Sequence, residues 1–110
     1  MSEVERPNFG ELVEAAQRMQ QEVQRVQQEL AGQTVEGSAG GGLVVVRANG
    51  RNQVLSVAID PQVLGVGELA MLQDLIVAAT NQALARAAEL AQQALTRVAG
   101  GLPLRLPGLL

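Results

Sequence analysis

The chain lacks several residue types on which most enzyme chemistry depends. Its 110 residues include no cysteine and no histidine, and all eight cationic side chains are arginines, so lysine is absent as well. Without cysteine there can be neither a disulfide nor a thiolate metal site. Without histidine and lysine, the commonest acid–base residue, the commonest metal ligand and the lysine of a phosphate loop are all missing. We therefore expect no enzymatic activity and no cofactor.

Aromatic residues and positive charge are also scarce. Phe9 is the only aromatic residue, which disfavours single-stranded nucleic acid as a ligand because its bases stack on aromatic rings. The net charge is −3, whereas nucleic-acid binders are usually basic, so any basic patch must be local. Residues 1–8 form a polar tail without a signal-peptide pattern, and no apolar run approaches the roughly 20 residues of a membrane span. We expect a cytoplasmic protein with no membrane and no small-molecule partner.

Two long helices are predicted, one at each end of a single domain. Asn8 is expected to cap the first, over residues 9–31, with Gly32 as its C-cap. The second is expected over 68–98, ended by the two glycines at 100–101. Apolar residues of the first helix recur in alternating steps of three and four, which is typical of a coiled-coil seam. They are Phe9, Leu12, Ala16, Met19, Val23, Val26 and Leu30.

Short β-branched segments between the helices predict a small antiparallel sheet, and hence an α+β fold with the order α-β-β-β-α. These segments are residues 34–36, 43–49 and 53–60. Asn49-Gly50 is a hairpin signal that predicts a type I′ turn, since both central residues of that turn need positive φ. The glycine-rich segment 37–42 predicts a flexible connection; a strand rather than a helix follows it, unlike in a phosphate loop. The domain then covers residues 9–101, followed by a Leu/Pro-rich tail over 102–110.

The predicted helices are too long for a compact monomer. The second would be about 46 Å long at ~1.5 Å per residue, whereas a compact globule of this size has a diameter of roughly 34 Å. Exposed strand edges are a second reason to expect a partner. We therefore expect a homodimer that buries the sheet and the helical seams together. The alternative is an antiparallel helical hairpin that covers the seam within one chain.

Four motifs occur in a characteristic order along the chain. The first two are A-A-Q-R-M-Q-Q-E-V-Q-R-V-Q-Q-E-L and V-E-G-S-A-G-G-G-L-V-V-V-R-A-N-G. The other two are V-A-I-D-P and M-L-Q-D-L-I-V-A-A-T-N-Q-A. Together with the Gly/Leu/Pro-rich tail they make residues 9–110 resemble the YbaB/EbfC family of bacterial nucleoid-associated proteins. The resemblance implies a dimer formed through the hairpin strands, location at the nucleoid, and binding of double-stranded DNA with little sequence preference through basic residues on the helices.

The same resemblance implies candidate sites. The helical cations that would contact DNA are Arg18, Arg25, Arg86 and Arg97. The strand residues of the implied dimer interface are Val44, Val45, Val46, Val54, Leu55 and Val57. The chain departs from the family in having glutamines where many members carry lysines along the first helix. The alternative is that Arg18 and Arg25 only form pairs with Glu14, Glu22 and Glu29 at i,i+4 spacing on a solvated face.

The leading hypothesis is therefore a non-enzymatic nucleoid-associated protein that binds duplex DNA through its phosphates. The alternative is a protein–protein interaction module that uses the Gln-rich helices and the apolar tail, with other proteins and not DNA as its partners. A purely structural oligomer is a third possibility. Salt distinguishes the first two, because phosphate binding weakens steeply with ionic strength. Asp60 and Asp74 have no histidine, lysine or carboxylate cluster to work with, so they support neither catalysis nor a metal site.

Overall fold

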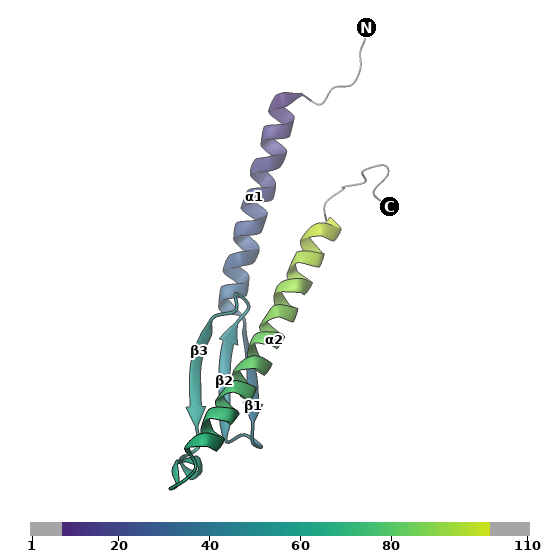
Figure 1. The fold of residues 1–110 in the computed structure, drawn as a ribbon. Coiled ribbons are helices and arrows are strands. Elements are labelled where there is room, and N and C mark those ends of the chain that lie inside the picture. The colour runs from purple at the N-terminus through teal and green to yellow at the C-terminus, as the bar shows by residue number, and fades with distance from the viewer. Residues whose placement is uncertain (1–7, 102–110) are drawn as a thin grey trace.

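The chain folds into an elongated α+β structure with the predicted order α-β-β-β-α. The computed structural model describes residues 8–101 (Figure 1), so most of the predicted N-terminal tail and the tail over 102–110 lie outside the described residues. The elements are α1 (Phe9–Gly32), β1 (Thr34–Ala39), β2 (Val44–Asn49), β3 (Val54–Ile59), the 3-10 helix η1 (Pro61–Leu64) and α2 (Leu69–Gly101). The radius of gyration is 22.0 Å, against about 13 Å for a compact chain of this length.

The two helices and the sheet form one long arm. Helix α2 crosses one face of the sheet and then continues beside α1, which projects from the end of the sheet (Figure 1). The principal extents are 83 × 26 × 16 Å. Most of the surface of α1 therefore remains open to solvent or to a partner.

The start of α1 is confirmed as predicted, but its end is not. The Asn8 side chain accepts a hydrogen bond of 2.8 Å from the Gly10 N–H, which satisfies one of the free donors of the first turn. The predicted C-cap at Gly32 is wrong, because Gly32 is the last helical residue and Gln33 is the cap. Gln33 is already extended, with φ −93°, so the chain passes directly from α1 into β1 without a left-handed residue.

Strand β1 is longer than predicted, because it includes the first residues of the glycine-rich segment 37–42. The sheet is antiparallel with the order β1-β2-β3, and β1 includes Gly37, Ser38 and Ala39, which were expected to form a flexible connection. A Cβ atom on Gly37 would lie 2.3 Å from the carbonyl oxygen of Ala79 and 2.4 Å from the amide nitrogen of Ala83. Gly37 therefore allows the backbones of β1 and α2 to touch, which no residue with a side chain permits.

The β2–β3 hairpin is confirmed, but the predicted type I′ turn is wrong. The residue with positive φ is Asn52 at 62°, and Gly50 does not have a positive φ. A Cβ on Gly50 would lie 2.7 Å from Cδ2 and 2.9 Å from the carbonyl oxygen of Leu30. The Gly50 N–H also donates to that carbonyl at 2.8 Å. Glycine at this position thus reflects close packing against the end of α1.

Asn49 fixes the same hairpin to α1. Its side chain is only 3% exposed, and its Oδ1 accepts hydrogen bonds from the backbone N–H groups of Arg51 and Gln53 at 2.9 and 3.1 Å. Its Nδ2 donates to Oε1 of Gln53 at 2.8 Å and to the Ala31 carbonyl at 3.3 Å. A buried amide must be hydrogen-bonded in this way to avoid a desolvation cost. The sheet and the base of α1 are therefore held in one orientation.

Small residues let α2 lie close to the sheet. The fully buried core residues are Val44, Val46, Ala48, Ala79, Ala83 and Ala87. The three α2 alanines follow one another at i,i+4 spacing, so they share one face of the helix. Helix α2 covers β1 and β2 but scarcely touches β3. All six residues of β3 remain exposed.

A second, smaller core joins the two helices. Val26 and Leu30 of α1 are buried with Ala94 of α2, and Leu90, Ala91 and Val98 pack around them. The rest of the predicted α1 seam is exposed, including Phe9, which is 77% exposed. The helical hairpin within one chain therefore covers only the C-terminal end of the seam.

The connection to α2 and its limits also differ in part from the expectation. Asp60 ends the strand region and accepts a hydrogen bond of 2.9 Å from the Gln62 N–H, as its position before proline suggested. Helix α2 begins at Leu69 and continues to Gly101. The predicted stop at residues 100–101 is wrong within the described residues, since both glycines are helical.

Candidate nucleic-acid interface

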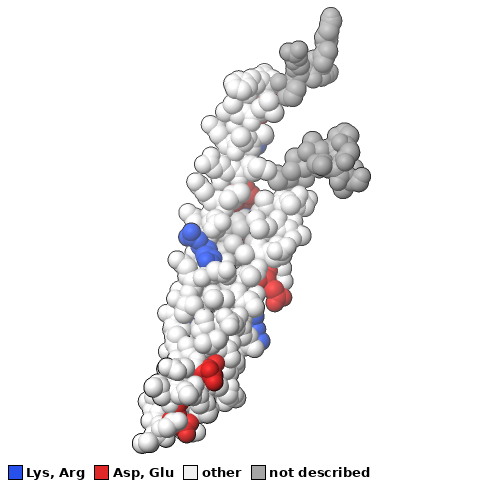
Figure 2. All heavy atoms as spheres, viewed as in Figure 1, with Lys and Arg blue, Asp and Glu red and all other residues white. Residues whose placement is uncertain are grey.

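The four arginines predicted to contact DNA all lie exposed on helices α1 and α2. Arg18 and Arg25 are on α1, and Arg86 and Arg97 are on α2. The face shown in Figure 2 carries cationic atoms only at separate spots, with acidic side chains between them. This face of the molecule therefore presents isolated cations rather than one continuous basic patch.

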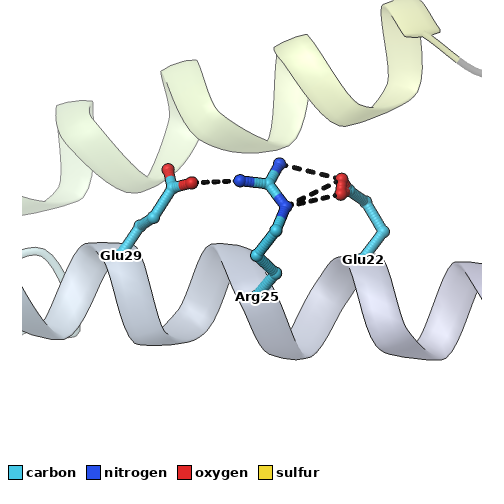
Figure 3. Close-up of polar contacts among 3 residues, drawn as sticks. All are labelled: Glu22, Arg25 and Glu29. Carbon is cyan, nitrogen blue, oxygen red and sulfur yellow. Dashed lines mark hydrogen bonds and ion pairs between the residues drawn. The ribbon is translucent and has the colours of Figure 1, made fainter.

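Arg25 is held between two carboxylates of its own helix (Figure 3). Its Nε and Nη2 donate to Glu22 at 2.8 Å each, and its Nη1 pairs with Glu29. The predicted Arg25–Glu29 pair is confirmed. The predicted Arg18–Glu22 pair is wrong, because Glu22 turns to Arg25 at i,i+3 instead. Within residues 8–101, no ion pair involves Arg18 or Arg97.

The same cluster shifts the protonation of its members. Hydrogen bonding from Arg25 lowers the pKa of Glu22 below the ordinary value of a glutamate, and Glu22 in turn raises the pKa of Arg25. Because the pKa of Glu22 is lowered, the pairing stabilises the folded helix at pH values above the ordinary glutamate pKa. This stabilisation is lost as the pH falls through the pKa that Glu22 has in the folded protein. Both side chains are open to solvent on the surface of α1, so the effect on global stability is small.

We expect Arg25→Gln to return the pKa of Glu22 to its ordinary range, because the main cause of the lowered value is then removed. The measurement is an NMR titration of the Glu22 side-chain carboxyl carbon in both proteins. Arg18→Gln is the matched control, since it removes the same charge from the same face without a bond to Glu22. An unchanged Glu22 pKa in Arg25→Gln would contradict the pairing.

The guanidinium of Arg86 is bound to a backbone carbonyl rather than to carboxylates. Its Nη1 donates to the Glu36 carbonyl oxygen at 2.6 Å, which ties α2 to the edge strand β1. The Glu36 side chain meets Arg47 of β2 at 3.5 Å on the sheet face away from α2. Arg86 therefore has a structural contact that leaves only part of its guanidinium for a ligand.

One cation at the base of the arm was missed by the sequence reasoning, which considered only helical arginines. Arg51 of the β2–β3 loop lines an open hollow of about 310 Å³ together with Gln27 and Leu30 of α1 and Ala91 of α2. The hairpin bends back onto α1 through Asn49 and Gly50, and no local sequence signal reports that contact. Arg51 therefore lies beside both helices although it belongs to a loop.

The residues of the predicted dimer interface fall into three groups. Val44 and Val46 are fully buried against α2 within the single chain, so they offer no surface to a partner. Val45 is half-buried on the opposite face of the sheet. The other three, Val54, Leu55 and Val57, are exposed on the edge strand β3. A register shift opposite Arg47 and Ala48 leaves Leu55 unpaired and 52% exposed.

The sheet face away from α2 is also open, and it carries the Glu36–Arg47 ion pair beside smaller side chains. Its β2 residues Val45 and Arg47 pair with Ser38 and Glu36 on one side and with Ala58 and Ser56 on the other.

In the part of the chain that the structure describes, no group of three or more acidic residues is placed to hold a metal ion. Neither described helix combines the length and the hydropathy that a membrane crossing needs.

This geometry defines an elongated α+β protein in which two antiparallel helices extend from a three-stranded sheet and carry scattered arginines. Residues 5–102 match the sequence model of the YbaB/EbfC DNA-binding family. The chain belongs to this family, as the resemblance of its motifs indicated.

Similar proteins agree over nearly the whole length. A nucleoid-associated protein of Acetivibrio thermocellus is 46% identical over 102 residues, covering 93% of this chain and 89% of its own. A nucleoid-associated protein of Syntrophobacter fumaroxidans is 51% identical over 94 residues, covering 83% and 86%. The crystal structure of an uncharacterized Helicobacter pylori protein has a TM-score of 0.77 at 22% identity, covering 86% of this chain and all of that one. This last likeness shows the fold alone.

Proposed function

We propose that the protein is a non-enzymatic, homodimeric nucleoid-associated protein that binds duplex DNA through phosphate contacts with little sequence preference. Membership in the YbaB/EbfC DNA-binding family carries the proposal, and the curated relatives are named nucleoid-associated proteins. The place of action would be the nucleoid in the cytoplasm. The exposed arginines of the helical arm supply the chemistry.

Phosphate binding suits these side chains. A guanidinium can grip a phosphate with two parallel N–H groups, and phosphate contacts carry no direct sequence information. Arg18 and Arg97 have no ion pair among the described residues, so they would reach a phosphate at the lowest cost. Arg25 would first have to leave Glu22 and Glu29, and Arg86 would keep one donor on β1. We therefore assign the main share of binding to Arg18 and Arg97.

A homodimer through the sheet is part of the proposal. The edge strand β3 exposes Val54, Leu55 and Val57, and an apolar strand edge of this kind readily pairs with another chain. The open face around Val45 provides a second surface for the same partner. A two-fold dimer would double the number of arginines available to one duplex.

The test is a titration of purified, nuclease-treated protein against a labelled duplex at increasing salt. We expect the logarithm of the binding constant to fall linearly with the logarithm of salt, with a slope of about 2 or more, at ~0.9 per phosphate neutralised. Arg18→Gln should reduce the slope. Gln17→Ala changes an exposed, uncharged side chain of the same helix and should leave the slope unchanged. Absence of binding at low salt would refute the DNA proposal.

The protein-interaction module remains the second candidate function. The observation that favours it is the exposed apolar seam on the N-terminal half of α1, together with the net charge of −3. An apolar docking surface would bind at least as well when salt rises, whereas phosphate binding would weaken. The same salt titration therefore separates the two functions.

A further inference from the structure

Helix α1 carries an apolar stripe that no described part of the chain covers. The stripe consists of Phe9, Leu12, Val13, Ala16, Met19 and Val23. It continues the seam that is buried at Val26 and Leu30 by α2. The side chains that flank it, such as Ala15 and Gln20, are mostly uncharged. The stripe is thus the uncovered half of a seam whose other half is a packed core.

The stripe begins where α2 ends. Val26 packs in the same cluster as Ala94 and Val98 of the antiparallel α2. Gly101, three residues beyond Val98, is therefore about level with Val23, since both helices rise ~1.5 Å per residue. Figure 1 shows α1 continuing well past the end of α2. From Val23 to Phe9 the uncovered part of α1 is about 21 Å long.

The sequence that follows Gly101 has the length and composition to cover this stripe. Residues 102–110 read L-P-L-R-L-P-G-L-L, with five leucines and one charge. An extended, strand-like segment of this length spans about 30 Å at ~3.3 Å per residue. Leucines 102, 104 and 106 alternate with other residues, so an extended chain would turn all three to one side. The two prolines disfavour a simple continuation of α2.

We propose that residues 102–110 dock along the α1 stripe of their own chain as an extended apolar segment. The position of Gly101 favours this occupant over a second copy of the chain, because the segment starts at the edge of the stripe and needs no encounter with another molecule. Docking would extend the α1–α2 core to the end of the arm. It would also keep the outer end of α1 from associating with other apolar surfaces.

Because the chain has no cysteine, one introduced cysteine can carry a spin label at a single defined position. A nitroxide spin label on Gly108→Cys should broaden the methyl signals of Ala16 and Leu12 in the full chain, while Leu64, in η1 at the far end of the molecule, stays sharp. A second sample mixes spin-labelled chains without isotopes and isotope-labelled chains without a spin label, refolded together. Broadening there would place the segment on a different chain and overturn the proposal. Absence of broadening in both samples would overturn it as well.

A matched pair of variants tests the stripe itself. Leu12→Gln with Met19→Gln should restore the intensity of the Ala16 methyl signal, because the apolar contact is lost. Val77→Gln with Leu95→Gln changes two exposed apolar residues of α2 away from the stripe, and the broadening should remain. Circular dichroism checks that the helical content is unchanged. Broadening that persists in the first variant would contradict docking on the stripe, and none of these readouts depends on DNA.

Discussion

Replacing Gly37 with alanine is expected to lower the free energy of unfolding by about 3 kcal/mol, the upper part of the usual range for an overfilled core. The new Cβ would lie 2.3 Å from the Ala79 carbonyl oxygen and 2.4 Å from the Ala83 nitrogen. Both are backbone atoms of α2 and cannot rotate away, so the helix and the sheet must separate. The loss is a large share of the roughly 5–15 kcal/mol that stabilises a typical domain.

The measurement is urea unfolding followed by circular dichroism at fixed protein concentration. Gly32→Ala is the matched control, because it adds the same methyl group to a glycine that has no atom within 4 Å of the new Cβ. Since Gly32 is helical, its replacement should leave stability unchanged or raise it by up to about 1 kcal/mol. Equal stability of Gly37→Ala and the unmodified protein would show that α2 lies farther from β1.

The element order was predictable because each element has a local cause. The alternating apolar steps of α1, the Asn8 cap and the Asp60-Pro61 break all act within a few residues. The structure confirms the helix, the cap and the strand end that they predict. The three strands were recognisable from β-branched residues flanked by turn formers. Local signals of this kind are enough for the order of elements in a small domain.

The glycines were misread because their role depends on distant residues. Gly37 was assigned to a flexible loop, but the residues that require it, Ala79 and Ala83, lie more than forty positions away. Gly50 was assigned to a turn that needs positive φ, but Leu30 requires it instead. A lone sequence cannot distinguish a glycine needed for conformation from one needed for close approach, because both lack a side chain.

The sequence predicted which arginines lie on the helices, but it did not predict the partners that their side chains bind. The sequence indicates that Arg18 and Arg25 lie on one face of a helix, but i,i+3 and i,i+4 partners are equally near on a helix surface. The choice of Glu22 for Arg25 depends on side-chain conformation. Arg86 binds a backbone carbonyl fifty residues away at Glu36. The burial of Val44 and Val46 likewise follows from where α2 lies on the sheet.

Freeing Arg25 is expected to strengthen duplex binding. Glu22→Gln with Glu29→Gln removes both carboxylates that hold the Arg25 guanidinium. The N–H groups of this guanidinium then become available to bind a phosphate. Each additional phosphate contact should raise the affinity about tenfold at ~50 mM salt and steepen the salt slope by ~0.9. The measurement is the salt titration of a labelled duplex with this variant and the unmodified protein in parallel.

The matched control is Glu11→Gln with Glu14→Gln, which removes the same two charges from α1. Within residues 8–101, neither Glu11 nor Glu14 forms an ion pair, so no arginine is released and only long-range repulsion falls. Such repulsion is screened within about 10 Å at 0.1 M salt, so the control should gain much less affinity than the Glu22 and Glu29 variant. Equal gains would mean that net charge alone limits binding and that the pairing of Arg25 does not matter. No gain in either variant would remove the face of α1 that carries Arg25 from the DNA interface and leave Arg97 of α2 as the principal candidate contact.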